Sequence, residues 1–377
     1  MRVDKTKWTK TILSEITHIT MGQSPDSSSY NKDAIGLPFY QGNADFGPIH
    51  PTPRIYCDAP TRTANEHELL ISVRAPIGAI NITNELCCIG RGLAAIQMID
   101  GKSYLHFIKY ILKAANEELN RQGTGMTFKA ISKKVLFNLT ICLPTFDIQQ
   151  TIASELDAIQ TMIDGYKAQL ADLDALAQSI FLDMFGDPVA NPNGWETELI
   201  KNVTHSHISQ LQVQKINGKI WVLNLDKIES QTGEIISMDL VDDSKIGPST
   251  FPFDNTMVLY SKLRPYLNKV IAPSQSGYAT TELVPFIPLE PLHKTYFVYL
   301  LRSSSMVKTL NATSGGARMP RTKMDIMKNM YIPVPAPYLQ QQFAHRIEAI
   351  EKQKELIKSQ LADAETLMAE RMQYYFS

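Results

Sequence analysis

Apolar side chains recur at alternating intervals of four and three residues in two long segments of the chain. The positions of the first series are Ile152, Leu156, Ile159, Ile163, Tyr166, Leu170, Leu173, Ala177, Ile180 and Met184. Those of the second series, each 191 residues after its counterpart, are Phe343, Ile347, Ile350, Lys354, Ile357, Leu361, Ala364, Met368, Arg371 and Tyr375. This spacing draws one apolar stripe along a helix, so it predicts two long helices of the coiled-coil type.

The length of these helices indicates that they pair with each other. About 36 residues give a helix of about 54 Å, longer than a small domain is wide. We therefore expect an antiparallel coiled coil of the two, with one globular block at each end. Gly186, with Pro188 close behind, predicts where the first helix ends. Lys354 and Arg371 interrupt the second stripe, where each either fixes the register of the pair or extends its charge to solvent from the edge.

Shorter patterns before each helix predict a mixed α/β (α+β) block. Each block has a buried strand, a turn with a second apolar run, a helix and a glycine-bearing loop. In pairs, these predicted elements are strands at 68–73 and 256–260, apolar runs at 79–82 and 269–271, helices at 105–115 and from 296, and loops at 123–125 and 314–316.

The chain also repeats its sequence once, at about half its length. Trp8 and Trp195 mark the two starts, and three ordered matches follow. They are residues 71–76 with Tyr260-Ser261 and Leu263-Arg264-Pro265, which aligns Arg74 with Arg264, then 138–144 with 329–335, and 148–150 with 339–341. We interpret this as a tandem duplication of one block and one helix. The predicted parts are residues 1–147, 148–187, 188–338 and 339–377.

Composition excludes several protein classes. Of the 377 residues, 44% are hydrophobic and 20% charged, which argues against a disordered chain. No stretch approaches the roughly 18 consecutive apolar residues of a membrane span. The four cysteines form no CxxC pair, which fits a reducing cytoplasm and argues against a disulfide scaffold or structural zinc. The net charge of −1 hides an uneven distribution: residues 1–150 and 188–338 each carry +3, and 151–187 carry −6.

Motifs for catalysis are missing from the sequence. There is no Walker A motif, GxGxxG, HExxH, GxSxG or Asn-Pro-Pro-aromatic motif. His205 and His207 form an HxH pair without a third ligand at a useful spacing, which favours a polar loop over a metal site. We therefore expect no catalytic residue and no metal site on this chain.

Two kinds of segment are suited to contact nucleic acid: an arginine after a buried strand, whose fork can bind phosphate or guanine, and a glycine-bearing basic loop. Polar-aromatic loops at 22–25 and 39–43 add side chains that can contact bases. The predicted DNA-binding residues are Gln23, Ser24, Tyr40, Gln41, Asn43, Arg74, Arg91, Thr127, Lys129, Lys133, Lys134, Lys262, Arg264, Lys269, Arg318, Arg321 and Lys323. Each pattern also fits an ordinary solvated loop.

The residues alone support a two-headed binding module. An enzyme with an unrecognised motif and a coiled-coil adaptor that binds only proteins remain as alternatives. Activity of the chain alone, with a divalent metal or S-adenosylmethionine, would indicate the enzyme. Sequence-selective, salt-dependent DNA binding would exclude the adaptor.

The ordered double pattern resembles the specificity subunits of type I restriction-modification systems. In the first half it runs through Trp8, Gly22-Gln23-Ser24-Pro25, residues 72–76, Leu143-Pro144, 148–150, the heptad helix and 184–188. In the second half it runs through Trp195, residues 261–267, 333–335, 340–342 and the second helix, and it has no Gly-Gln-Ser-Pro equivalent that we can align.

This resemblance implies two target-recognition domains, each reading one half of a bipartite site on double-stranded DNA. It implies that the helices set the spacer and dock methyltransferase subunits, two of them, and that motor-nuclease (restriction) subunits join for cleavage. S-adenosylmethionine, ATP and Mg²⁺ would then be used by those partners, with no cofactor on this chain. The implied location is the cytoplasm of a prokaryote, at the nucleoid, in phage defence.

Overall fold

The computed structural model of the chain describes residues 3–125, 129–206, 211–316 and 318–377. It has the predicted mixed α/β fold and divides into two compact units. Unit 1 comprises Met1–Gly165 with Gln360–Ser377, and unit 2 comprises Tyr166–Ser359. Each long helix thus contributes one half to each unit, a division that differs from the separate helical parts 148–187 and 339–377 drawn from the sequence.

Unit 1 holds a four-stranded sheet of order β2-β10-β7-β8, a five-stranded sheet of order β3-β5-β4-β9-β6, and a β1-β11 pair. The strands are β1 (Thr9–Ile12), β2 (Thr17–Met21), β3 (Tyr30–Asn31), β4 (Leu37–Tyr40), β5 (Tyr56–Cys57), β6 (Thr63–Ala64), β7 (Leu69–Ser72), β8 (Ile80–Ile82), β9 (Cys87–Ile89), β10 (Leu93–Met98) and β11 (Thr140–Leu143). The helices that begin in it are α1 (Leu13–Ile16), α2 (Leu105–Ala114), α3 (Asn116–Gln122), α4 (Lys133–Phe137) and α5 (Phe146–Phe185).

Unit 2 repeats this plan with sheets β13-β20-β17-β18, β15-β14-β19-β16 and β12-β21. Its strands are β12 (Thr197–Leu199), β13 (Thr204–His205), β14 (Ile220–Leu223), β15 (Asp239–Val241), β16 (Thr250–Phe253), β17 (Val258–Ser261), β18 (Val270–Ile271), β19 (Gly277–Thr280), β20 (Leu283–Pro288) and β21 (Tyr331–Pro333). The helices that begin in it are α6 (Ile200–Val203), α7 (Lys294–Arg302), α8 (Ser304–Ala312), α9 (Met324–Lys328) and α10 (Pro337–Phe376). The matching order agrees with the duplication inferred from the sequence.

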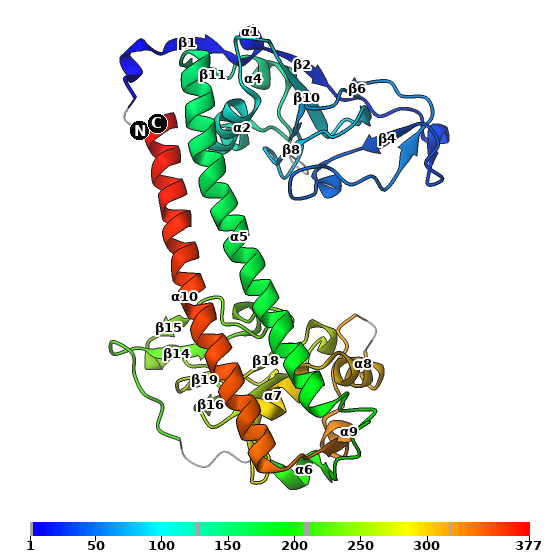
Figure 1. The fold of residues 1–377 in the computed structure, drawn as a ribbon, viewed down its shortest axis with the longest axis vertical. Coiled ribbons are helices and arrows are strands. Elements are labelled where there is room, and N and C mark those ends of the chain that lie inside the picture. The colour runs from blue at the N-terminus through cyan, green and yellow to red at the C-terminus, as the bar shows by residue number, and fades with distance from the viewer. Residues whose placement is uncertain (1–2, 126–128, 207–210, 317) are drawn as a thin grey trace. The chain divides into compact units, whose positions relative to one another are not determined.

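The core of unit 1 lies between its four-stranded sheet and α5. Helix α2 packs there with Phe107 and Ile108, which are fully buried, and its apolar positions meet Ile152 and Leu156 of α5. Figure 1 shows α2 beside α5 on the side of the strands. The two chain ends also meet in this unit, where the backbone N–H of Val3 donates to the Tyr374 hydroxyl at 3.1 Å.

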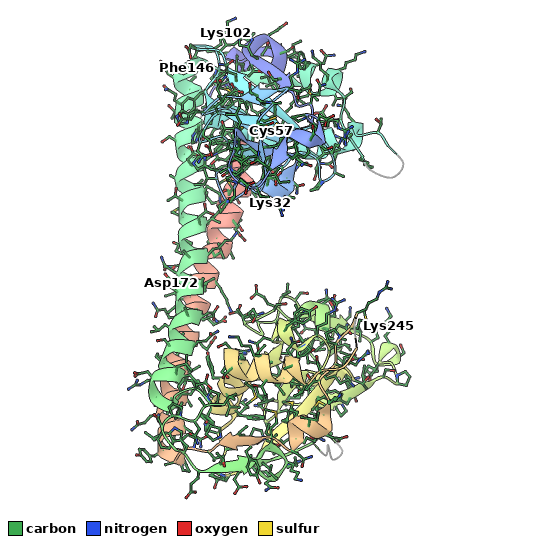
Figure 2. All side chains as sticks on the ribbon, turned by 90° about the vertical axis from the view of Figure 1, so that its right-hand side faces the viewer. Lys32, Cys57, Lys102, Phe146, Asp172 and Lys245 are labelled. Carbon is green, nitrogen blue, oxygen red and sulfur yellow. The ribbon has the colours of Figure 1, made fainter. Side chains whose placement is uncertain are left out.

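A buried glutamine ties the first turn of each long helix to the loop before α2 in unit 1 and to the loop before α7 in unit 2. Gln149 accepts from the backbone N–H of Tyr104 at 2.9 Å and donates to the Lys102 carbonyl at 2.9 Å. Figure 2 places Lys102 and Phe146, the first residue of α5, at the same end of unit 1. Gln340 makes the same two bonds in unit 2, with His293 at 2.8 Å and Pro291 at 3.0 Å. The repeated glutamine noticed in the sequence therefore has a structural role in both units.

The two apolar stripes are buried along the helices as predicted. In unit 1, Ile152, Leu156, Ile159 and Ile163 of α5 are at most 4% exposed. In unit 2, Phe343, Ile347, Ile350 and Ile357 of α10 are at most 7% exposed. The remaining pairing residues are partly buried: Leu170, Leu173, Ile180, Leu361 and Met368. Within unit 2 the helices run antiparallel, because Asp174 faces Lys354 while the later Phe181 faces the earlier Phe343.

Towards its end, α5 departs from the predicted stripe. The predicted stripe residues Ile180 and Met184 are only partly buried, whereas their neighbours Phe181 and Phe185 are each 2% exposed. The reason is an aromatic cluster on the side of the globular block. The Phe343 ring lies 5.7 Å from that of Phe181, 5.5 Å from that of Phe185 and 5.2 Å from that of Tyr299. Such edge-on aromatic contacts stabilise the core beyond the area they bury.

Lys354 occupies a stripe position of α10 and is only 3% exposed, so it does not extend to solvent. Its ammonium lies 2.7 Å from Asp174 of α5 and 2.6 Å from Glu234 in the loop before β15. Glu351 stands 3.6 Å away. Burial alone would lower the pKa of Lys354, but the hydrogen bonds that it donates to Asp174 and Glu234 raise it above its ordinary value. The lysine therefore joins both helices and the sheet domain of unit 2. Arg371, half exposed, pairs with Glu155 at 2.9 Å in unit 1.

Asp157 of α5 joins this helix to α2 through three side chains. Lys109 and the Tyr110 hydroxyl each donate to its carboxylate at 2.7 Å, and His106 contacts the other oxygen. Burial alone would raise the pKa of Asp157, but the hydrogen bonds from Lys109 and Tyr110 and the charges of Lys109 and His106 bring it below its ordinary value.

We expect Asp157→Asn to lower the free energy of unfolding of unit 1 by about 1–2 kcal/mol at pH 7, because hydrogen bonds to a charged group are lost. A carboxylate with a lowered folded pKa stabilises the fold above its unfolded pKa of about 4, and this contribution is lost as the pH falls through the folded value. Urea titrations at pH 7 and pH 3 measure the difference. A gap between wild type and variant that is as wide at pH 3 would contradict the assignment.

Candidate nucleic-acid interface

A pocket of about 270 Å³ opens in unit 1 where four loops meet. Its lining is almost entirely polar side chain and glycine: Ser24, Gln41, Gly42, Asn43, Arg74, Ala75, Arg91 and Gly92. Five of the DNA-binding residues predicted from the sequence, Ser24, Gln41, Asn43, Arg74 and Arg91, thus come together although they are spread over some seventy positions. The strands β4, β7 and β9 end beside these loops and position them.

Glycines allow the loops to approach each other this closely. A Cβ atom on Gly22 would lie 2.1 Å from the carbonyl oxygen of Gly90, and one on Gly92 would lie 2.2 Å from that of Gln41. Both distances are far inside van der Waals contact, so neither position accepts another residue without movement of the backbone. The Gly-Gln-Ser-Pro segment is therefore required by packing at its first position, and Ser24 enters the pocket as a result.

Asp45 fixes the loop that carries Gln41 and Asn43. Its carboxylate accepts from the backbone N–H of Gln41 at 2.8 Å, and Arg54 donates to it at 2.9 Å. Asp45 is 7% exposed, and the guanidinium balances its charge. Neither residue could be predicted from the sequence, because an Asp four residues after a loop glutamine carries no motif that distinguishes it from an ordinary turn residue.

The electrostatic character of the pocket is positive. Arg74 and Arg91 are exposed, and no carboxylate belongs to the lining. Neither guanidinium has an ion pair or hydrogen bond to another residue in the described part of the chain. Two such guanidinium groups, beside the amide of Gln41 and the hydroxyl of Ser24, are suited to bind phosphate oxygens or the acceptor edge of a base.

Two neighbouring predictions need correction or restriction. Tyr40 is 1% exposed and belongs to the core beneath the pocket, so its side chain does not face a ligand there. Both faces of strand β4 are buried, with Phe39 and Tyr40 in different core clusters, and Gln41 follows the strand and is exposed. Gln23 is exposed next to the pocket but does not line it, and its carbonyl accepts from the Thr61 hydroxyl at 2.7 Å.

The arginines after the buried strands are not equivalent, contrary to the match in the sequence. Ser72 and Ser261 hold the same place, opposite Leu93 and Leu283 in the neighbouring strand. Counting on from them, Arg74 corresponds to Leu263, and Ala75 corresponds to Arg264. The hydrogen bonds agree, because Ala75 donates to the Lys129 carbonyl and Arg264 to that of Pro320 in the equivalent loops.

This shift of one residue gives the two arginines different surroundings. Arg264 has a left-handed backbone, with φ of 50°, and is partly buried. Its Nε is buried and makes no hydrogen bond within the described residues. Because Arg264 stands one position later than Arg74 and has a left-handed backbone, it does not take the role of Arg74. A role inferred for one arginine therefore cannot be transferred to the other.

The basic loop of unit 1 lies next to Arg74. Arg74 forms a bridge with Ala130, which places the exposed Lys129 at the same edge. Arg74 and Lys129 thus form a basic margin beside the pocket. Thr127, predicted to contact DNA, lies outside the described residues.

Lys133 and Lys134, also exposed, open helix α4, and the Lys133 ammonium sits 4.6 Å from the centre of the Phe137 ring. Lys134 lines a separate pocket together with Glu118.

The predicted cations of unit 2 are partly engaged in the fold. Arg321 donates to Glu282 at 3.0 Å, and this hydrogen bond lowers the pKa of the Glu282 carboxyl. Lys269 donates to the Leu225 carbonyl at 2.7 Å. The other cations are Lys262, which is partly buried, and Arg318 and Lys323, which are exposed. Leu283 of unit 2 and Leu93 of unit 1 occupy equivalent strand positions, so Glu282 corresponds to the pocket residue Gly92. The Glu282–Arg321 ion pair therefore stands where unit 1 has an open pocket.

Neither a metal site nor a membrane span is found in the described part of the chain. No group of three or more potential metal ligands occurs among those residues. No helix there has the length and apolarity needed to cross a bilayer. His205 is exposed, and His207 lies outside the described residues, so the HxH pair stays untested.

The chain matches a known protein family over most of its length. The family model described as type I restriction modification DNA specificity domain matches residues 5–174 and 210–366. The putative type I restriction enzyme MjaX specificity subunit of Methanocaldococcus jannaschii is 45% identical over 162 residues, which are 43% of this chain and 38% of that protein. The MjaIX specificity subunit of the same organism is 25% identical over 75% of this chain and 70% of its own length. The chain thus spans well under half of the MjaX subunit.

Solved structures show the same likeness. The type I restriction-modification S subunit from M. genitalium matches 100% of this chain and 98% of its own, with a TM-score of 0.60 and 12% identity, and so supports the fold. The HsdS subunit from Thermoanaerobacter tengcongensis is 46% identical over 41% of this chain and 37% of its own, with a TM-score of 0.38.

Proposed function

Because this chain belongs to the type I restriction-modification DNA specificity family, we propose that it recognises a bipartite sequence on double-stranded DNA, with one half-site read by each unit. The observation that carries the proposal is the pocket of unit 1, where five polar side chains predicted to contact DNA meet without a carboxylate among them. The basic margin of Arg74 and Lys129 supplies phosphate contacts beside it.

The divergence of the two units supports two different half-sites. Unit 1 has an open pocket, whereas the equivalent edge of unit 2 carries the Glu282–Arg321 pair. The edge of unit 2 carries a carboxylate, which accepts hydrogen bonds, whereas the arginines of the unit 1 pocket can only donate them. The two edges are therefore suited to different bases. We propose that each unit reads its own sequence and that the paired helices set the spacer between them.

The partners we propose are methyltransferase subunits, two of them, docked on the long helices, and restriction motor-nuclease subunits. Chemistry would take place on those subunits, with S-adenosylmethionine, ATP and Mg²⁺ bound there, and this chain would be non-catalytic. The proposed location is the cytoplasm of a prokaryote, at the nucleoid.

The test is to express the chain with the methyltransferase subunits encoded beside it and to map adenine methylation across the host DNA. We expect one split motif with a fixed spacer, methylated only when this chain is present. Combined Arg74→Ala and Arg91→Ala should reduce methylation of that motif at least tenfold, since two phosphate or base contacts of about 1 kcal/mol or more are removed. Methylation that is indifferent to the chain would leave the adaptor as the better function.

A further inference from the structure

Arg91 stands on a tight turn that holds its backbone firmly. Leu93 donates to the Gly90 carbonyl at 3.0 Å and closes the turn, and Gly90 donates to the Tyr40 carbonyl at 2.8 Å. Gly90 and Gly92 on either side pack against Gln41 so closely that a Cβ on either would contact its backbone at 3.2 or 2.2 Å. The Cα atom that carries the exposed Arg91 side chain is therefore held in place, as recognition of a ligand with a defined geometry requires.

The surroundings of Arg91 differ from those of Arg74. Its backbone N–H contacts the Ser24 hydroxyl at 3.3 Å, and Gln41 is its neighbour across the turn. These are hydroxyl and amide groups, and no lysine belongs to the pocket lining. Arg74 lines the same pocket, but its bridge with Ala130 also places it beside the loop of Lys129. Hydroxyl and amide groups that pair with base edges thus surround Arg91, whereas Arg74 also has a neighbouring lysine that attracts phosphate.

We propose that Arg91 reads a guanine in the half-site of unit 1, while Arg74 contacts a phosphate beside it. This inference rests on the proposed function of the chain. A guanidinium donates two parallel hydrogen bonds to O6 and N7 of guanine in the major groove, and no other base offers that pair of acceptors. A phosphate contact carries no sequence information, so the two arginines differ in what their removal does to DNA binding.

The experiment uses the chain assembled with its methyltransferase subunits and duplexes carrying the mapped motif. Each position of the first half-site is changed in turn to the three other bases, and affinity is measured between 50 and 200 mM salt. In the wild type, one guanine of this half-site should be preferred. Arg91→Ala should remove the preference at that position alone, a loss of about 5- to 150-fold in discrimination.

Two further variants separate base reading from a structural role. Arg91→Gln should move the preference from guanine to adenine, because a glutamine amide pairs with N6 and N7 of adenine. Arg74→Ala should weaken binding to all duplexes alike and reduce the salt slope by about one. Lys102→Ala is the control, because Lys102 is an exposed cation in the loop before α2 and does not line the pocket. It should change neither property.

The outcomes distinguish this inference from the function on which it rests. A wild-type complex that selects no split motif would overturn both. A split motif whose base preferences all survive Arg91→Ala would overturn the role of Arg91 and leave the proposed function intact. Uniform weakening by Arg91→Ala, with a smaller salt slope, would make Arg91 a phosphate contact and equally refute the guanine assignment.

Discussion

Replacing Lys354 with alanine is expected to lower the free energy of unfolding of unit 2 by about 3 kcal/mol, because it removes the cation that Asp174 and Glu234 share in a partly dry environment and leaves Glu234 paired with Lys358. Asp174 and Glu234 are each about 30% exposed, so water solvates them only in part once the ammonium is gone. Urea unfolding followed by tryptophan fluorescence suits the measurement, since Trp195 and Trp221 belong to unit 2 and only Trp8 to unit 1.

The controls for Lys354 use its own surroundings. Lys352→Ala removes an ion pair with Glu348 at 2.8 Å whose lysine is 75% exposed, and it should cost less than about 0.5 kcal/mol. Lys354→Ile combined with Asp174→Asn and Glu234→Gln removes all three charges together, and it should recover most of the stability. A triple variant as unstable as Lys354→Ala would show that packing, and not charge pairing, is what the lysine provides.

Phe343→Ala should lower the free energy of unfolding of unit 2 by about 3–5 kcal/mol, the usual cost of truncating a fully buried phenylalanine. Phe343 is 0% exposed and packs against three aromatic rings of α5 and α7, so the neighbours cannot all close the cavity. Urea unfolding monitored by circular dichroism measures the change.

Tyr338 serves as the matched aromatic control for Phe343, because it stands on the same helix and is 62% exposed. Tyr338→Ala should change the free energy of unfolding by no more than about 0.5 kcal/mol. If Phe343→Ala were equally mild, the aromatic cluster would not be what holds the long helices to the globular part of unit 2.

The parts of the fold that could be predicted from the sequence are those that depend on residues close together along the chain. The stripe from Phe343 to Tyr375 is buried because helical periodicity alone decides which face of a helix is apolar. The repeated glutamines were visible because Gln149 and Gln340 stand at the same step before each stripe. The pocket residues Gln41 and Asn43 could be proposed because they follow a strand in a polar loop.

The remainder depends on contacts between residues distant in the sequence. Lys354 proved to be a buried ion-pair centre because Glu234, 120 positions earlier, reaches it from a loop. The match of Arg74 with Arg264 was wrong by one residue, since register is set by strand pairing and not by the letters near a proline. Tyr40 was taken for a DNA-binding residue because the sequence does not show that both faces of its strand are buried.

The cysteines of unit 1 allow the opening of this unit to be followed by chemical labelling. All four lie in this unit, where Cys142 is exposed and Cys57, Cys87 and Cys88 are buried, with Cys57 among the packed side chains seen in Figure 2. Burial also raises the pKa of the Cys88 thiol to about 11, which keeps it out of the reactive thiolate form near neutral pH. A maleimide reagent therefore meets one accessible thiol on the native chain and gains the other three only as unit 1 opens. Because unit 2 has no cysteine, the number of labels per chain counts the opening of unit 1 alone.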